Sequence, residues 1–238
     1  NPPFKPLVPM PIGSGIVWPG MNGGKVFRNY IFDNWRHGTV LAAVPDEVAG
    51  DPEGNLDEQV HCTQRTLATT SCANRYEDNV MGRVPPGFRW PTAIGKFGNK
   101  YGNRNSEVLP NGVDFWWDEF PGNNGNCWRN NTGADGTGAS VTGTGDGLPP
   151  NTLPGDCESS MGTGDVVKEG VLLDCTTWYD FKGEGLYPLC YWFRMPQRPG
   201  TAAAAADRRS WQRTADAFAA SPDGGRLRAR LGALSAGS

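Results

Sequence analysis

Asparagine recurs at a five-residue spacing in three parts of this chain, each time across a short run of β-prone residues. The three pairs are Asn29 and Asn34, Asn74 and Asn79, and Asn126 and Asn131. Asparagine tolerates the left-handed backbone conformation that a tight corner requires, and its amide can bond to the backbone or to a stacked asparagine. The pattern therefore predicts short strands that end at corners in a wound, all-β architecture. It does not identify a reaction.

The composition indicates a folded chain of short strands and long loops. Its 238 residues include 33 glycines and 20 prolines, which favour turns. Charged residues make up only 20% of the chain, and nine tryptophans and ten phenylalanines supply apolar surface to bury. These values exclude a disordered chain, and the length suits one large β domain with an appendage, or two domains.

The charge and hydropathy patterns exclude two classes of partner. A net charge of −3 does not provide the basic surface of a nucleic-acid-binding protein. The sequence has no apolar run long enough to span a membrane, so we expect no membrane span. Asn1 opens a proline-rich arm instead of a secretory signal, and we expect that residues upstream of it are missing.

The cysteines predict disulfides, and therefore a secreted or cell-surface protein. The six are Cys62, Cys72, Cys127, Cys157, Cys175 and Cys190. No two have the C-x-x-C spacing, and the only histidines are His37 and His61, so a zinc site is poorly supported. Many connectivities are open, and we expect the sequential one, which pairs 62 with 72, 127 with 157 and 175 with 190.

Shifts in composition divide the chain into five segments. They are an extended proline-rich arm (1–24), strand-bearing coils (25–131), a Gly/Pro-rich loop (132–156), a disulfide-tied cap (157–200) and a helical tail (201–238). In the tail, Thr201 is a candidate N-cap, and Trp211, Ala215 and Phe218 recur at helical spacing. The apolar stripe predicts packing on the domain or self-association with a sister subunit. Six arginines in the tail leave contact with an anionic polymer or lipid as the alternative.

Three segments together resemble the C-terminal coils of secreted right-handed parallel β-helix repeat proteins of bacteria. They begin at Gly24-Lys-Val-Phe-Arg-Asn, at Asn79-Val-Met-Gly and at Pro110-Asn-Gly-Val-Asp-Phe-Trp-Trp. The resemblance covers about residues 15–195 and implies an all-β, right-handed parallel β-helix of few coils, followed by the cap and the helical tail. That superfamily includes polysaccharide lyases, glycoside hydrolases and non-enzymatic surface proteins, so the resemblance is specific for architecture and poor for activity.

The best catalytic candidates lie on the expected strand 112–120. Alternation along a strand places Asp114, Trp116 and Asp118 on one face and Trp117 on the other. An exposed Trp116 could stack on a sugar ring, and carboxylates could supply acid and base for glycoside cleavage. On one strand, however, Asp114 and Asp118 lie roughly 13 Å apart, beyond the ~6.5–9.5 Å of an inverting pair. A solvated strand face with an aromatic plug is the alternative.

A second candidate cluster lies near the end of an earlier strand. It contains Asp33, Arg36 and His37, and His37-Gly38 resembles an element of polygalacturonase-type β-helices, although the paired aspartates expected beside it are missing. Arg36 and Lys25 could instead neutralise a uronate, as in a lyase, and Lys96 could join them in one groove. An ordinary corner histidine is the alternative.

The sequence leaves two functions open and implies no cofactor. Calcium ligands could come from Asp46, Glu47 and the acidic segment 51–58, but no calcium-loop motif is present. The favoured function is polysaccharide binding by a secreted protein, and the resemblance leaves open whether that protein is part of a lyase or a hydrolase. The alternative is a non-enzymatic cell-surface or assembly protein. The sequence does not establish whether the chain is an enzyme.

Overall fold

The computed structural model describes residues 10–45, 68–88, 110–136, 153–160, 162–180 and 188–236. Its strands are β1 (Ser14–Pro19), β2 (Lys25–Phe27), β3 (Tyr30–Ile31), β4 (His37–Ala42), β5 (Val44–Pro45), β6 (Ala68–Thr69), β7 (Arg75–Glu77), β8 (Val80–Met81), β9 (Val113–Trp117) and β10 (Cys127–Arg129). Its helices are α3 (Val166–Asp180), α4 (Ala202–Ala219) and α5 (Pro222–Ala236).

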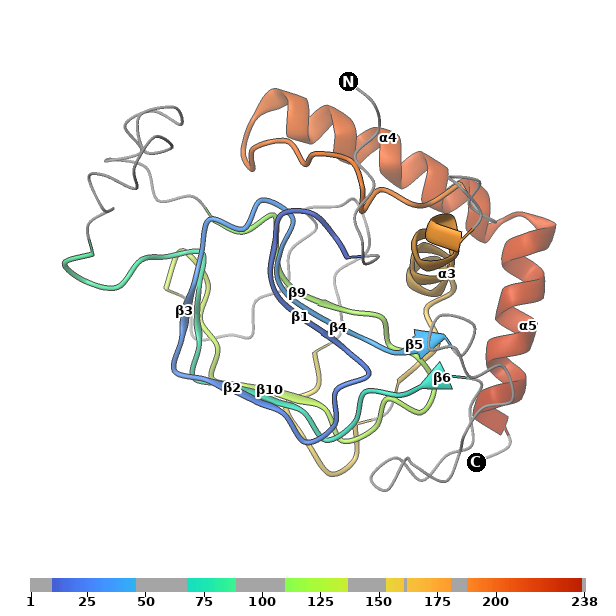
Figure 1. Ribbon diagram of the computed structural model, residues 1–238, viewed down its shortest axis with the longest axis horizontal. Helices are drawn as coiled ribbons and strands as arrows, with labels where there is room; N and C mark the ends of the chain where they lie inside the picture. Colours follow the sequence, from blue (N-terminus) through green and yellow to red (C-terminus); the bar gives the residue numbers. More distant parts are fainter. Residues whose placement is uncertain are drawn as a thin grey trace.

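The strands form three small parallel sheets, each built from segments far apart in the sequence. Their strand orders are β1-β4-β9, β10-β7-β2 and β3-β8, while β5 and β6 make a short antiparallel pair. Each passage of the chain contributes a strand to successive sheets, so equivalent residues stack in register. Val26, Tyr76 and Trp128 are one such set. Figure 1 shows these strands lying side by side on the walls of one wound unit.

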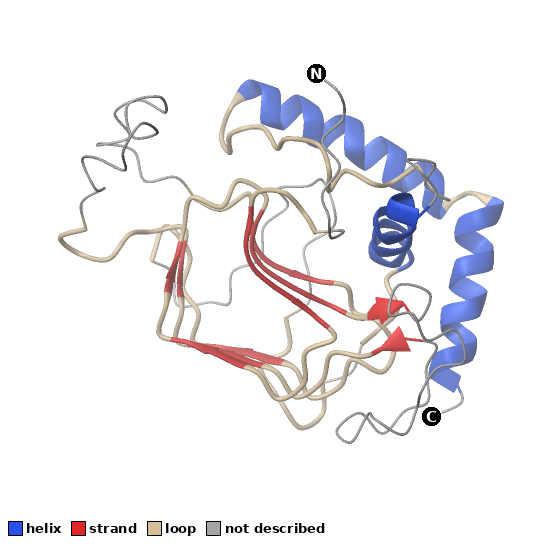
Figure 2. Cartoon of the chain, in the orientation of Figure 1, coloured by secondary structure: helices blue, strands red, loops and turns tan. Residues whose placement is uncertain are grey.

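The helices pack together beside the sheet β1-β4-β9 (Figure 2). One apolar cluster joins that sheet to all three helices and includes Val40, Trp116, Val171, Phe218 and Leu231. The other face of the same sheet contributes to a second cluster that fills the space between the sheets. The sheet is therefore buried on both faces, as parallel sheets usually are.

The prediction of an all-β, right-handed parallel β-helix is wrong. In the described residues the parallel sheets are short, and three helices pack beside them. The proline-rich arm and the cap also contain regular structure that the sequence did not reveal. Ser14–Pro19 forms β1 at the edge of a sheet, and Val166–Asp180 forms α3.

The helical tail has the structure expected from its sequence. The hydroxyl of Thr201 accepts a hydrogen bond from the backbone N–H of Ala204, 3.1 Å away, and caps α4. Pro222 opens α5, where its missing N–H costs no helical hydrogen bond. Ala215 and Phe218 are buried against the rest of the domain. This confirms the expected packing of the apolar stripe.

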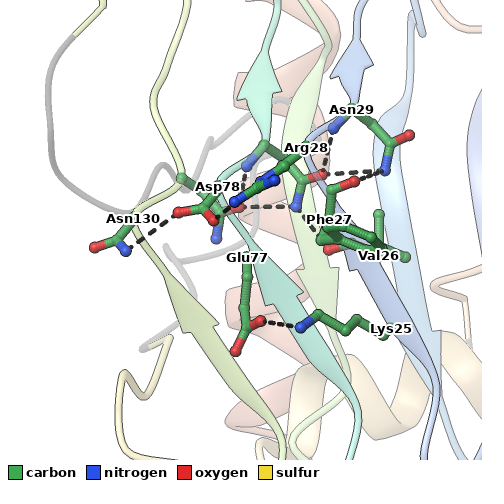
Figure 3. A network of polar contacts seen from close by, with 10 residues as sticks. Lys25, Val26, Phe27, Arg28, Asn29, Glu77, Asp78 and Asn130 are labelled. Carbon is green, nitrogen blue, oxygen red and sulfur yellow. Dashed lines mark hydrogen bonds and ion pairs between the residues drawn. The ribbon is translucent and has the colours of Figure 1, made fainter.

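The asparagine pattern marks the corners, as expected. At each corner, a residue with positive φ precedes the asparagine, as at Arg28 (56°), Asp78 (57°) and Asn130 (53°). The Asn29 side chain donates to Oδ1 of Asn79 at 3.2 Å, and the Asn79 side chain donates to Oδ1 of Asn131 at 2.9 Å. Figure 3 shows this corner, with Arg28, Asp78 and Asn130 stacked beside the amides. Asn79 and Asn131 are fully buried, so their mutual hydrogen bonds replace bonds to water.

Two disulfides confirm part of the sequential pairing. Cys127 is bonded to Cys157, and Cys175 to Cys190. Cys72 is also in a disulfide, and Cys62, its expected partner, lies outside the described residues. The Cys175–Cys190 bond ties α3 to the loop that follows it, and the Cys127–Cys157 bond ties β10 to the segment 153–160. Both bonds therefore fasten irregular chain onto regular elements.

Candidate functional site

A pocket of about 180 Å³ opens where α4 crosses the loop 188–197 and the chain entering β4. Three arginines and three aromatic residues line it, namely Arg36, Arg194, Arg208, Trp35, Tyr191 and Trp211. Ligand pockets for drug-sized molecules typically measure ~300–1,000 Å³. This pocket is smaller, so it suits a single ring or a chain end.

Arg36 holds the base of the pocket together. Its side chain is 4% exposed. Its Nε donates to the carbonyl of Ile12 at 3.0 Å, and its Nη2 donates to the carbonyl of Arg194 at 2.5 Å. The guanidinium carbon also lies 4.7 Å from the centre of the Tyr191 ring, a cation–π distance. Arg36 thus fixes the N-terminal segment and the 188–197 loop relative to β4.

One face of α4 forms the roof of the pocket. Asp207, Arg208, Ser210, Trp211 and Thr214 all line it, and residues three or four apart share a helix face. The Trp211 ring meets the ring of Tyr191 edge-on, with centroids 4.8 Å apart. Its indole N–H is buried and has no hydrogen-bond partner among the described residues. A buried donor of this kind is costly unless something accepts from it.

These side chains offer a specific combination of interactions. Guanidinium groups bind carboxylates through short, charge-assisted hydrogen bonds. Indole and phenol rings present apolar faces with a polar tip. Serine, threonine and aspartate add donors and acceptors for hydroxyl groups. The pocket is therefore equipped for a ligand that is ring-shaped, rich in hydroxyls and acidic.

Of the candidate catalytic and substrate-binding residues expected on the strands, only Arg36 lines this pocket, where it is joined by Trp211 and Arg208 of the helical tail. His37 is fully buried, and its Nδ1 lies 2.9 Å from the hydroxyl of Ser14. Its ring packs near the rings of Trp116 and Tyr191, with centroids 6.0 and 6.4 Å away. These contacts match the ordinary structural histidine that the sequence left open. They leave no room for a substrate beside the imidazole.

Trp116 does not form an exposed stacking surface, and that expectation is corrected. Its side chain is 2% exposed and meets Trp192 edge-on, with ring centroids 5.9 Å apart. The strand register was nevertheless right, because Trp117 lies in the cluster between the sheets and Trp116 on the opposite face. The helices and the loop that carries Trp192 cover that face, so it meets protein instead of solvent.

The two candidate carboxylates are also buried. Asp114 accepts a hydrogen bond from the side chain of Asn111 at 2.8 Å, and burial raises its pKa to about 6. Asp118 accepts hydrogen bonds from the backbone N–H groups of Ala43 and Phe120 and from the side chain of Asn123. Burial raises its pKa to about 7, although these hydrogen bonds oppose the shift. Neither lines the pocket under α4.

The two lysines expected in the same groove do not join Arg36. Lys25 lies on β2, in a different sheet, where its Nζ is 2.7 Å from Glu77 and 5.0 Å from the centre of the Phe27 ring. Lys96 lies outside the described residues. The basic groove predicted from Arg36, Lys25 and Lys96 is therefore not assembled by the residues that the structure describes.

A buried cluster of charges connects the end of β9 to the start of α3. Lys168 is 1% exposed, and its Nζ lies 2.5 Å from Glu119 and 3.8 Å from Asp165. Glu169 is fully enclosed, and its Oε1 has no hydrogen-bond partner within the described residues. Burial, and then repulsion from Asp118, raises the pKa of Glu169 well above its ordinary value. This cluster could not be predicted from the sequence, because Glu119 and Lys168 are 49 residues apart along the chain.

This cluster predicts a stability that falls as the pH rises. Burial raises the pKa of Asp118 and Glu169 in the folded state. Their contribution to the free energy of unfolding is therefore fully present below the pKa of the unfolded state, which is about 4. It is lost as the pH increases through the folded pKa, about 7 for Asp118. We expect urea denaturation to give a lower free energy of unfolding at pH 8.5 than at pH 5.5.

The substitution Glu169→Gln tests the origin of that pH dependence. It removes the charge and keeps the shape, so it should stabilise the fold at pH 8.5 and flatten the dependence. Glu158→Gln is the matched control, because Glu158 is exposed. Equal slopes for the wild type and Glu169→Gln would assign the pH dependence to other groups.

Comparison of the chain with family models, curated proteins and solved structures gave no match. None of the described helices is long and apolar enough to cross a membrane. Within the described residues, no group of three or more His, Cys, Asp and Glu side chains could hold a metal ion. The calcium ligands considered above, Asp46, Glu47 and the segment 51–58, lie outside those residues.

Proposed function

We propose that this protein binds polysaccharide outside the cell, and that the pocket under α4 receives one acidic sugar unit. The observation that carries the proposal is the meeting of Arg194, Arg208 and Trp211 in a pocket of single-ring size. The disulfides support an oxidising compartment. The lining residue Arg194 is exposed, so a longer chain could continue from the pocket.

Each part of the pocket has a distinct role in this proposal. Arg208 and Arg194 hold the carboxylate, and Trp211 presents its ring to the sugar. Asp207, Ser210 and Thr214 accept from or donate to hydroxyl groups. Arg36 is a positioning residue, because its guanidinium is bound to two backbone carbonyls and a ring.

Binding assays with charged and neutral oligosaccharides test the proposal. We expect oligogalacturonate or oligomannuronate to quench tryptophan fluorescence in a saturable way, and neutral cello-oligosaccharides to do so weakly. Hydrogen bonds to a charged group contribute about 1.5–3 kcal/mol, so Arg208→Gln should weaken acidic-sugar binding by roughly 10- to 100-fold. Trp211→Phe should retain part of the affinity.

The control uses the same helix. Arg213 is exposed on α4 and does not line the pocket, so Arg213→Gln should bind as the wild type does. An equal loss in both variants would mean that general attraction to a basic helix, and not the pocket, holds the glycan. Absence of binding by any acidic oligosaccharide would refute the proposal.

A second candidate function is that of a non-enzymatic surface or assembly protein. The burial of His37 and Asp118 favours it, because groups sealed from solvent cannot act on a polymer. The same glycan panel distinguishes the two candidates, since an assembly protein would bind none of the sugars in the pocket.

A further inference from the structure

The three parallel sheets have one open edge in common. The outer strands β1, β2 and β3 each pair on one side only, and within the described residues no strand pairs with their other side. At β10 the opposite edge is covered. There the N–H of Trp128 donates to Pro154 at 2.8 Å, the N–H of Gly125 donates to Ser160 at 2.9 Å, and Cys127 is bonded to Cys157.

Five of the six buried asparagines in the described residues follow one hydrogen-bonding rule, while Asn123 donates to Asp118 instead. Each of the five donates from its side-chain nitrogen to a backbone carbonyl of the preceding turn, three positions before the residue on which it stacks. The five pairs are Asn74 with Met21, Asn79 with Val26, Asn111 with Ile31, Asn126 with Ser71 and Asn131 with Tyr76. The donor–acceptor distances are 2.7–3.0 Å. The rule links every turn to the one before it.

The asparagines of the first turn break this rule. Asn29 donates to Phe27 and Asn34 donates to Phe32, each only two residues back in its own segment. They also donate to the asparagines of the next turn, as Asn74 and Asn79 do. Their Oδ1 atoms, by contrast, accept no hydrogen bond from any described residue, whereas Oδ1 of Asn79 accepts two from Asn29. The first turn therefore carries the acceptors for another turn of the same geometry.

The corner charges specify what would fit there. Arg28 is 76% exposed and lies 3.9 Å from Asp78, and Asn130 donates to the other side of the same carboxylate (Figure 3). A segment stacked outside Arg28 would meet its positive charge, and an acidic residue at that corner would continue the pairing. The next residue would be an asparagine, so that its N–H and amide could donate to Asn29.

We propose that the open edge of β1, β2 and β3 docks an extended segment of a partner polypeptide. The segment runs parallel to the strands, carries asparagines five residues apart, and has an acidic residue immediately before the asparagine that stacks on Asn29. Addition of a strand to an exposed sheet edge is a known mode of peptide recognition. Here the main chain supplies the affinity, while the asparagine ladder and the corner charge supply the register.

The chain itself provides a suitable probe. In residues 73–82, Asp78 and Asn79 would stack on Arg28 and Asn29, and Asn74 would lie over Gly24. A synthetic peptide of that sequence, titrated to millimolar concentration, should shift the NMR signals of β2 and β3 amides in a saturable way. A control peptide with alanine in place of both asparagines should bind at least tenfold more weakly, because it lacks the ladder.

A charge reversal tests the register. Arg28→Glu should weaken the peptide at least tenfold, and a peptide carrying lysine at the position of Asp78 should bind Arg28→Glu better than it binds the wild type. Arg209→Glu is the control, because Arg209 is exposed on α4 and should leave peptide binding unchanged.

Several outcomes would overturn the proposal. One is equal binding of the asparagine and alanine peptides, and another is no shift at β2 and β3 at millimolar peptide. Edge amides that exchange slowly in the free protein would show that its own chain already covers the edge. Concentration-dependent shifts at the edge without peptide would assign it to a second copy.

Discussion

Removal of residues 201–238 is expected to unfold the whole domain. The tail places Phe218, Leu227 and Leu231 in the same apolar cluster as Val40 and Trp116 of the central sheet. Burial of each large apolar side chain contributes about 1.5–3 kcal/mol, so loss of three removes roughly 5–9 kcal/mol. Domains of this size have total stabilities of about 5–15 kcal/mol. Near-ultraviolet circular dichroism and urea denaturation of the shortened chain measure the effect.

Single substitutions on α4 supply the control for that experiment. Phe218→Ala should cost about 3–5 kcal/mol, because the side chain is buried in the apolar cluster and packs against α3 at Gly170. Arg213→Ala, on the exposed face of the same helix, should stay within about 0.5 kcal/mol of the wild type. A shortened chain that keeps a cooperative urea transition would contradict this prediction and show that the sheets fold without the tail.

Local signals in the sequence correctly located the corners and the two C-terminal helices. Asparagine after a left-handed residue is a local requirement, so its spacing could be read without knowing which turns stack. Thr201 and Pro222 act on the first turn of their own helices, and capping is likewise local. The stacking of Asn29 on Asn79 could not be predicted in this way, because a long stretch of sequence separates the two residues.

Helix α3 could not be predicted from propensity. It contains Gly170 in its interior, which costs about 1 kcal/mol relative to alanine, and several β-branched residues that favour strands. The structure shows why glycine is needed there. A Cβ at Gly170 would lie 2.7 Å from Leu189 and 2.8 Å from Phe218. Packing of α3 against α4 and the 188–190 segment therefore stabilises the helix. No local sequence pattern indicates that packing.

The candidate pocket was missed for the same reason. Arg36 was identified because it lies next to a predicted strand. Arg208 and Trp211 belong to the tail, and no local sequence pattern indicates where the tail packs on the domain. The face of Trp116 was expected to meet solvent, since alternation along a strand separates two faces without saying what covers either. Helices α3, α4 and α5 cover it here, which turned an expected binding surface into core.

Replacement of Lys168 by methionine is expected to destabilise the fold by about 3–5 kcal/mol, the usual cost of removing one partner of a buried ion pair. Lys168 is the one cation within 4 Å of Glu119 among the described residues, and its Nζ lies 2.5 Å from that carboxylate. Without it, Glu119 and Glu169 would share a buried site with no compensating charge. Urea denaturation at pH 7 measures the loss.

A double substitution separates the charge from the packing. Lys168→Met with Glu119→Gln removes both members of the pair, so it should recover a large part of the stability lost in Lys168→Met alone. Lowering the pH should also rescue Lys168→Met more than the wild type, because protonation of the buried carboxylates removes the uncompensated charge. If the single and double variants were equally unstable at every pH, the lysine would act through its packed methylene groups, and the charge cluster would have no part in holding α3 to β9.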